Sequence, residues 1–227
     1  MTPASVPGRE SPTTAAAQTF DAPLFVFLWR GLCVCAMAHG GGDHRRRLLE
    51  GLSGRVIEVG AGQGLNFPYY PSTVSEVLAV EPENRLRADA IEAAGAAPVP
   101  IRVVPGLADR LPAGDAEFDA AVISLVLCSV ADQAQALAEL RRVIRPGGEL
   151  RFYEHVHADE RLLSTAQRVF DPLWSRLGGG CHLTRDTEAA IARAGFSIER
   201  VERFSFKPGA LAVLGSPHIL GIARRPA

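Results

Sequence analysis

The chain has 227 residues, of which 47% are hydrophobic, and its formal net charge at pH 7 is −1. This length suits one large domain, and the hydrophobic share is enough for a substantial core. A net charge so close to zero excludes a global positive field that would attract nucleic acid or an anionic membrane surface. We therefore expect a globular domain that does not bind nucleic acid.

Two segments at the N-terminus differ in composition from the rest of the chain. Residues 1–19 are rich in Ser, Thr, Pro and Ala and lack periodicity, which is typical of a disordered leader. The apolar residues 22–38 could be a signal peptide ending at Ala36-Met37-Ala38, or a short membrane span. However, Arg30 interrupts this run, and a span needs about 20 apolar residues in succession. We favour a helix packed on the domain over membrane-surface contact or a targeting signal, and expect a cytoplasmic protein without a stable membrane span.

Residues 23–50 are predicted to form a helical lid with a break at Gly40-Gly41-Gly42. Asp43 is a residue type that caps helix N-termini, and Gly51 can end the second helix. The aromatic side chains of the lid either roof an apolar pocket or cover the core; a pocket of this composition favours a small lipophilic acceptor. The residues of this region that we expect to bind the acceptor are Phe20, Phe25 and Trp29.

After the lid, short apolar runs alternate with amphipathic segments. The runs predict strands at Arg55–Gly60, Val77–Glu81, Ile101–Val104, Ala120–Leu125 and Glu149–His155. The amphipathic segments predict helices at Arg85–Ala94, Asp132–Ile144, Arg161–Leu177 and Asp186–Ala194. This alternation indicates an α/β fold with a doubly wound, mostly parallel sheet and helices on both faces.

Two late strands, near Ser197–Phe206 and Leu220–Arg225, are joined by a segment that contains Pro and Gly. We expect them to add a hairpin-like antiparallel unit to the sheet. Because the sequence shows no internal repeat, we predict a single domain after the leader. Its parts are the lid (20–50), a cofactor-binding core (51–160) and the C-terminal helices and strands (161–227), together spanning residues 20–227.

The first predicted strand runs into a loop with glycines on alternate positions, Gly60, Gly62 and Gly64. Glycines let the backbone approach a ligand closely and adopt positive φ. The dinucleotide fingerprint has its third glycine one residue later, and a phosphate-binding loop would need a Lys-Ser/Thr pair. Glu58, just upstream, is unhelpful beside a pyrophosphate but suits a cofactor with a cationic amino-acid end. Glu81 ends the next strand, where an acid that binds ribose is expected. The pattern points to S-adenosylmethionine.

Five features, in order over residues 55–155, resemble those of class I methyltransferases. The glycine loop resembles the first motif of that family, and Glu81 resembles the acid that binds both ribose hydroxyls. Gly106–Pro112 resembles the loop beside adenine, Phe118–Ser124 the fourth strand, and Leu140–Gly148 the turn before the fifth. The resemblance implies a Rossmann-like fold with S-adenosyl-L-methionine as cofactor and S-adenosyl-L-homocysteine as product.

The resemblance also implies a cofactor site at the carboxyl ends of the first strands. Many relatives carry Asp at or near the position of Gly106. Because this chain has glycine at that position, we expect backbone and apolar groups of the loop, and not the Asp109 side chain, to recognise adenine. The residues expected at the cofactor are Glu58, Gly60, Ala61, Gly62, Gly64, Asn66, Phe67, Glu81, Pro82, Gly106, Leu107, Ala108, Ser124, Leu125 and Cys128.

A narrower resemblance, over most of residues 43–225, is to the microsomal alkyl-thiol S-methyltransferases and their bacterial relatives. It implies methylation of a small thiol, such as a xenobiotic or a sulfur-containing secondary metabolite. N- or O-methylation of a small molecule, a quinone precursor or an amine lipid headgroup is an alternative, as is a regulator that binds the cofactor without catalysis. The segments that carry the resemblance are Leu125–Val130, Tyr153–Val156, Asp171–Trp174, Gly180–Arg185 and Pro217-His218.

Methylation of a thiol proceeds through its thiolate, so one proton must be removed. His155 is the predicted base, because an imidazole titrates near neutral pH. Asp171 could orient His155 or bind substrate, and His182 could line the acceptor pocket. The alternatives are a hydrogen bond of His155 within the core, a helix-capping role for Asp171 and a loop position for His182.

The four cysteines, Cys33, Cys35, Cys128 and Cys181, do not form a metal-binding motif by their spacing. None belongs to a CxxC pair, and Cys33 and Cys35 are too close together for a usual zinc knuckle. We predict buried, reduced thiols and no metal site. Direct methyl transfer needs no covalent enzyme intermediate, so the sequence does not call for a cysteine nucleophile; it also does not predict the oligomeric state.

Overall fold

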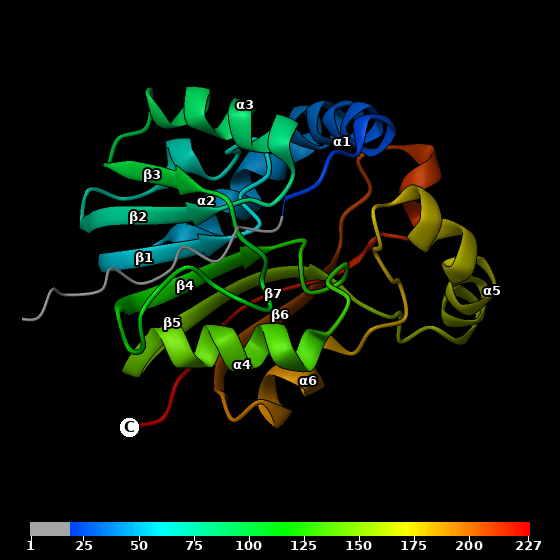
Figure 1. The fold of residues 1–227 in the computed structure, drawn as a ribbon. Helices are drawn as coiled ribbons and strands as arrows, with labels where there is room; N and C mark the ends of the chain where they lie inside the picture. Colours follow the sequence, from blue (N-terminus) through cyan, green and yellow to red (C-terminus); the bar gives the residue numbers. More distant parts are fainter. Residues whose placement is uncertain (1–18) are drawn as a thin grey trace, which may run out of the picture.

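The computed structural model describes residues 19–227, so the predicted leader, apart from Thr19, lies outside the described residues. A seven-stranded sheet with the order β3-β2-β1-β4-β5-β7-β6 crosses the molecule (Figure 1). The pairs among β1 to β5 are parallel, whereas β7 is antiparallel to both β5 and β6. The strands are β1 (Gly54–Val59), β2 (Val74–Val80), β3 (Ile101–Val104), β4 (Phe118–Ser124), β5 (Ile144–His155), β6 (Ser197–Ser205) and β7 (Pro217–Arg224).

Helices cover both faces of the sheet, which confirms the predicted α/β fold. On one face, α4 and α6 pack over a cluster that includes Ile57 and Val59; on the other, α2 and α3 pack over a cluster that includes Val56 (Figure 1). Successive β1 residues thus point to opposite cores, as a strand buried on both faces requires. The helices are α1 (Pro23–Ala36), α2 (Gly42–Leu49), α3 (Asn84–Ala94), α4 (Gln133–Val143), α5 (Arg161–Leu177) and α6 (Thr187–Arg193).

Aspartate side chains cap the starts of two predicted helices. The Asp132 carboxylate accepts a hydrogen bond from the Gln135 backbone N–H at the start of α4. The Asp186 carboxylate accepts one from the Ala189 N–H at the start of α6. The two late strands pair antiparallel, as predicted, and β7 places their hairpin next to β5.

Some predicted boundaries differ from the structure; among them, β2 and β7 each begin three residues earlier than expected, at Val74 and Pro217. Asp43 is not an N-cap, because α2 already begins at Gly42 and the Asp43 carboxylate accepts from Arg46 instead. The break before α2 comes from Gly40, whose φ of +96° a helix cannot contain. The turn Pro146-Gly147-Gly148 lies within β5, which starts at Ile144, because the pairing of β4 with β5 shifts register there.

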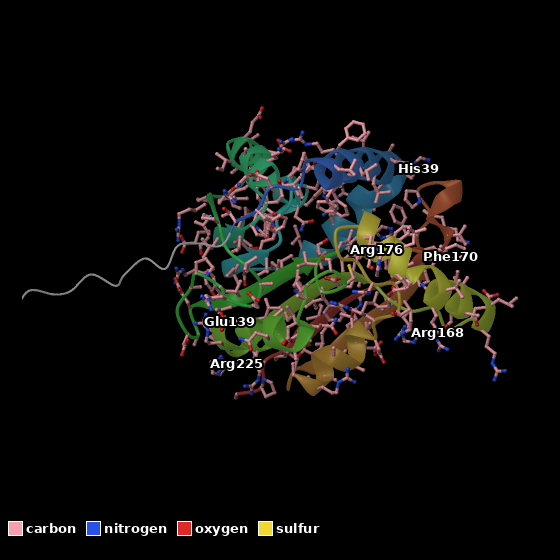
Figure 2. All side chains as sticks on the ribbon, turned by 45° about the vertical axis from the view of Figure 1, so that its right-hand side comes forward. His39, Glu139, Arg168, Phe170, Arg176 and Arg225 are labelled. Carbon is pink, nitrogen blue, oxygen red and sulfur yellow. The ribbon has the colours of Figure 1, made fainter. Side chains whose placement is uncertain are left out.

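The lid consists of α1 and α2, joined at an angle by the kinked segment Met37–Gly41. Val26 and Cys33 of α1 point inward, whereas Leu24 and Phe27 are 69% and 75% exposed. The continuous stretch Pro23–Leu49 is long and apolar enough to cross a membrane by length and composition. Figure 2 shows His39, in the kinked segment after α1, on the same side of the molecule as Phe170 of α5. One face of the lid therefore covers the domain, and the other is apolar and exposed.

Candidate active site

A cavity of about 320 Å³ opens beneath α1, at the carboxyl ends of the strands. This is the position where open α/β sheets bind their ligands. The cavity brings together most of the predicted site residues, from the lid, the glycine loop, the ends of three strands and the loop after β3. Those that line it are Phe20, Phe25, Trp29, Gly60, Gly62, Glu81, Pro82, Gly106, Leu107, Ala108, Ser124, Leu125, Cys128 and His155.

The glycine loop forms one wall of this cavity, and its glycines have different reasons to be glycine. Gly60 and Gly62 have φ values of +72° and +57°. A Cβ on Gly60 would lie 2.3 Å from Val126 Cγ2, so packing excludes a side chain there. A Cβ on Gly62 would have Trp29 Nε1, at 3.8 Å, as its nearest neighbour. Gly62 is thus bare toward the cavity, where a ligand can approach its backbone.

Glu81 closes the end of β2 and holds the glycine loop. Its Oε2 accepts a hydrogen bond of 2.7 Å from the Gly62 N–H, and its Oε1 accepts one of 2.9 Å from the Glu83 N–H. Burial raises the pKa of the Glu81 carboxyl, and these backbone donors oppose the rise. Each carboxylate oxygen can accept a second hydrogen bond. Glu81 can therefore hold the loop and still accept hydrogen bonds from a ligand in the cavity.

Glu58 lies fully buried at the back of the loop. Its two oxygens accept hydrogen bonds from Asn66 Nδ2 at 2.9 Å and from the Tyr70 hydroxyl at 2.7 Å. Burial raises the pKa of Glu58 to about 7, against the effect of these two donors. Its immediate role is to tie the loop to the segment after it. The predicted cofactor residues at the back of the loop are Glu58, Ala61, Gly64, Asn66 and Phe67, and their contact with the cofactor stays a prediction.

The loop after β3 forms the opposite end of the cavity. A Cβ on Gly106 would lie 2.8 Å from Val80 Cγ1, so this position has no room for the Asp found in many relatives. Leu107 and Ala108 line the cavity, whereas Asp109 is exposed. This end of the cavity offers apolar side chains and backbone groups to a flat ring.

A smaller chamber of about 70 Å³ adjoins the main cavity. Five residues line both spaces and form the wall between them: Trp29, Leu32, Leu125, His155 and Trp174. The smaller chamber is lined mainly by apolar and aromatic side chains. The residues that line the smaller chamber and not the main cavity include Cys33, Ala36, Met37, Tyr153, Phe206 and His218.

His218 brings a second imidazole to the smaller chamber, against the His155 ring at a centroid distance of 4.4 Å. Burial, and then the proximity of His155, lowers the pKa of His218 to about 2. Because the Ser216 carbonyl can only accept, His218 Nδ1 carries the proton of their 2.8 Å hydrogen bond. His218 is therefore a neutral ring that faces the chamber.

The turn after β4 is strained and tightly held. Leu125 has a φ of +60°, a conformation that few non-glycine residues adopt. The buried carboxylate of Glu154 accepts hydrogen bonds from the N–H groups of Val126, Leu127 and Cys128, at 2.9, 2.9 and 3.1 Å. Burial raises the pKa of Glu154 to about 7, and the three donors oppose this rise. Glu154 thus fixes the turn that presents Leu125 and Cys128 to the cavity.

His155 meets two cysteines at the wall between the chambers. Its Nδ1 lies 3.6 Å from Cys181 Sγ and 4.0 Å from Cys128 Sγ. A hydrogen bond with the Cys128 thiol, and then the neighbouring His155, lowers the pKa of the Cys181 thiol because both stabilise the thiolate. All four cysteines are free thiols, as predicted, although Cys35 is only half-buried.

Asp171 pairs with His182 rather than with His155. Its Oδ2 lies 2.7 Å from His182 Nδ1, and its Oδ1 accepts from the Leu183 N–H at 2.6 Å. The His182 N–H in turn donates to the Cys128 carbonyl at 2.8 Å. Asp171 lies inside α5 and therefore does not cap it. Its geometry favours holding the loop that carries Cys181, and its predicted role in catalysis stays a prediction.

Cys181 and Trp174 are the main lining residues that the sequence did not indicate. Both lie in the segments that resemble thiol methyltransferases, Trp174 near the candidate Asp171 and Cys181 beside the candidate His182. Tryptophan and cysteine are also common in protein interiors, so residue type alone does not distinguish a cavity position from a core position.

Comparison with known proteins agrees with this geometry. The methyltransferase domain family matches residues 57–152. The human thiol S-methyltransferase TMT1B is 40% identical over 185 residues, which cover 77% of this chain and 73% of that protein. The phosphatidylethanolamine N-methyltransferase of Cereibacter sphaeroides is 29% identical over 162 residues, 70% of this chain and 76% of that protein. The crystal structure of a SAM-dependent methyltransferase from Thermotoga maritima has a TM-score of 0.68 at 20% identity, covering 88% of this chain and 96% of that chain.

Proposed function

Because the chain belongs to the S-adenosylmethionine-dependent methyltransferases, in the family of the thiol S-methyltransferases, we propose that it S-methylates a small lipophilic thiol by in-line transfer. The observation that carries the proposal is the apolar chamber, which shares a wall with the cofactor cavity. Acceptors of this class include xenobiotic thiols and sulfur-containing secondary metabolites. The enzyme would then serve in detoxification or secondary metabolism.

The residues of the main cavity fit S-adenosylmethionine. Gly62 leaves its side of the cavity free, and the Glu81 oxygens can still accept from hydroxyl groups. Ser124 Oγ is buried without a hydrogen-bond partner among the described residues, so it is available to a ligand. The cavity volume lies within the usual range for small-ligand sites. When bound, the cofactor supplies a methyl group on a sulfonium centre.

We assign distinct tasks to the residues of the shared wall. Trp29 and Trp174 would exclude water and position the acceptor, and positioning can supply much of the rate acceleration of a direct transfer. A thiol with a pKa of about 8.5 is only a few per cent ionised at neutral pH. His155 can accept its proton, because the imidazole lies at the wall between acceptor and cofactor.

N-methylation of an amine is the second candidate function. It is favoured by the similarity to a phosphatidylethanolamine N-methyltransferase, and an aromatic chamber can bind a cation over its ring faces. The thiol is preferred because the similarity to the thiol S-methyltransferase is higher and a chamber lined mainly by apolar groups suits a neutral acceptor.

A panel of acceptors tests this proposal. The purified protein is incubated with S-adenosylmethionine and thiols, phenols or amines of similar size, and S-adenosylhomocysteine is measured. We expect turnover with lipophilic thiols. Turnover with amines or phospholipid alone would replace the proposed acceptor, while leaving the methyltransferase activity in place.

We also propose that the enzyme works in the cytoplasm and contacts membranes only peripherally, through α1. Gly40, with a φ of +96°, breaks the long apolar stretch Pro23–Leu49, so its straight apolar helix is α1 alone. α1 has 14 residues, or about 21 Å at 1.5 Å per residue, whereas the hydrocarbon core of a bilayer is about 30 Å thick. The Arg30 guanidinium also anchors α1 to α3 through a two-pronged ion pair with Asp89. Flotation with lipid vesicles tests this: dilution should release the protein, because one short apolar face binds a bilayer only weakly and reversibly, and retention that only detergent reverses would contradict it.

A further inference from the structure

Three side chains with metal-binding atoms meet at the wall between the two chambers. Cys128 follows β4, His155 ends β5, and Cys181 lies in the loop between α5 and α6. Their ligand atoms, the two Sγ and His155 Nδ1, all lie within 4.8 Å of one another. These three residues are called the Cys2His cluster below. Each of them lines the main cavity.

The spacing within the Cys2His cluster is close to that of a tetrahedral zinc site. With Zn–S bonds of about 2.3 Å and Zn–N bonds of about 2.0 Å, tetrahedral angles place a ligand sulfur about 3.5 Å from a ligand nitrogen. The observed Sγ–Nδ1 distances are 3.6 Å for Cys181 and 4.0 Å for Cys128. Shifts of a few tenths of an ångström would bring all three atoms onto one ion.

We propose that the Cys2His cluster binds one zinc ion, and that the fourth position of this ion receives the acceptor thiol. The inference rests on the proposed function, because it concerns how the thiol is activated. Structural zinc sites are closed by four protein ligands, whereas catalytic sites use three and leave one position open. The Cys2His cluster has three protein ligands and lies in a cavity wall, so it has the composition of a catalytic zinc site.

The two loops that carry the cysteines are held together by other residues. Glu154 accepts from the Cys128 N–H, and the Cys128 carbonyl accepts from the His182 N–H. The Arg185 guanidinium donates to the carbonyls of Leu127 and Val130, which connects the Cys181 loop to the Cys128 turn. Such outer-shell hydrogen bonds orient metal ligands. The arrangement is therefore built from fixed elements of the fold.

Neighbouring polar groups leave the fourth position to an external ligand. Both oxygens of Glu154 already accept from backbone N–H groups. His218 uses its Nδ1 for the Ser216 carbonyl. With two thiolates and a neutral imidazole, the charges of the ligands cancel that of Zn²⁺.

The chemical step balances without a further reactant. The acceptor thiol binds the ion as thiolate and releases its proton to water, since zinc deprotonates a coordinating thiol. The thiolate sulfur then forms a bond to the methyl carbon, while the bond from that carbon to the sulfonium sulfur breaks and its electron pair stays on that sulfur. The products are the methyl thioether, S-adenosylhomocysteine and the proton. In the zinc-loaded enzyme, the ion takes the proton-removing role proposed above for His155, which becomes a ligand.

Metal binding by the full-length protein tests the inference independently of turnover. The reduced chain is freed of metal with a chelator and titrated with Zn²⁺ against a chromophoric competitor, and in parallel with Co²⁺, whose thiolate complexes absorb in the ultraviolet and visible. We expect one ion per chain and the spectrum of a tetrahedral site. Cys128→Ser and Cys181→Ser should weaken Zn²⁺ binding by more than about 100-fold, beyond the effect of losing an outer-shell partner.

Cys35→Ser is the matched control, because the Cys35 thiol donates to the Pro208 carbonyl, away from the cluster. It should bind Zn²⁺ like the unchanged chain. Adding an alkyl thiol should change the Co²⁺ spectrum of the unchanged chain, and the corresponding alcohol should not. The circular dichroism spectrum and the thermal melt of each variant check that it is folded.

The outcomes separate this inference from the proposed function. A metal site that responds to thiol, in a protein that methylates no thiol of the panel, supports the site and refutes the function. Thiol methylation that persists undiminished after complete removal of metal refutes the zinc site and leaves the function. Binding of less than one Zn²⁺ ion per two chains also overturns the inference. So does an equal Zn²⁺ affinity of Cys181→Ser and Cys35→Ser. So does a chain that holds Cys128 and Cys181 as a disulfide and binds no metal once reduced.

Discussion

Gly62 gives the sharpest test of where the cofactor binds, because its substitution separates strain from blockage of the cavity. Gly62→Ala places a methyl group at a φ of +57°, and Gly51→Ala does the same at +76°. Left-handed backbone costs a non-glycine residue about 1–2 kcal/mol, partly offset by the lower entropy of the unfolded alanine chain. Both variants should therefore lose about 1 kcal/mol of stability, which lowers Tm by roughly 2–4 °C for a chain of this size.

The two variants differ in what the new methyl group meets. At Gly51 a Cβ has open space, whereas at Gly62 it points into the cavity, with Trp29 Nε1 at 3.8 Å as its nearest neighbour. Crowding a filled site by one methyl group costs about 1–3 kcal/mol. This corresponds to a Kd for S-adenosylhomocysteine raised by about 5- to 140-fold in Gly62→Ala. In Gly51→Ala the Kd should be unchanged.

Titration calorimetry with S-adenosylhomocysteine measures the two dissociation constants, and a thermal melt of each protein without ligand measures the strain. Equal Kd values in the two variants would refute the placement of the cofactor against Gly62. A Gly62→Ala protein far less stable than Gly51→Ala would show that Gly62 packs against the fold and does not face an open cavity.

Two further predictions follow from the chambers and from the buried acid behind the loop. Phe206→Ala enlarges only the smaller chamber, so it should raise the KM for a lipophilic thiol several-fold and leave the Kd of the cofactor unchanged. Trp29→Ala should raise both constants, because Trp29 lines both spaces. Equal effects of Phe206→Ala on the two constants would contradict the assignment of one space to the acceptor and the other to the cofactor. Burial raises the pKa of Glu58 to about 7, against about 4.3 in an unfolded chain, so between these pH values the folded state binds more protons and its stability falls as pH rises. The loss of unfolding free energy attributable to Glu58 is on the order of 3 kcal/mol. When urea unfolding is measured from pH 5 to 7.5, the unfolding free energy of Glu58→Gln should therefore change less with pH than that of the unchanged chain. Identical slopes of unfolding free energy against pH in the two proteins would argue against the raised pKa of Glu58.

The sequence predicted the parts of the fold that depend on local pattern. Apolar runs of strand length and helices with an aspartate at the start were located to within a few residues, because hydrophobic alternation and capping are local properties. Boundaries failed where glycines decided them. Gly40 breaks the lid helix before Asp43 can cap it, and Gly147 lets β5 start earlier than expected.

The candidate site was predictable where the residues of a sequence motif themselves line the cavity. Gly62 and Glu81 line the cavity as expected. Glu58 was correctly expected at the strand end, but it shares the face of Val56, and side chains two residues apart point to the same side of a strand. It therefore meets Tyr70 in the core behind the loop.

The meeting of Cys128, His155 and Cys181 could not be predicted from spacing. The three residues come from the turn after β4, the end of β5 and the loop between α5 and α6. The hydrogen bonds of Asp171 and Arg185 hold the Cys181 loop in place. Their sequence separation corresponds to no known metal motif, which is why a metal site was not expected.

The most direct test of which atom accepts the methyl group compares three acceptors that differ only in that atom. The relevant measurement is kcat/KM for a thiol, an alcohol and an amine on the same lipophilic scaffold, with methyl-labelled S-adenosylmethionine and the methylated product identified by mass. We predict labelled thioether and S-adenosylhomocysteine in equal amounts, and a kcat/KM for the thiol at least about 100-fold above the others, equivalent to about 2.7 kcal/mol in the transition state. A higher kcat/KM for the amine or the alcohol would contradict the assignment of this chain as a thiol methyltransferase.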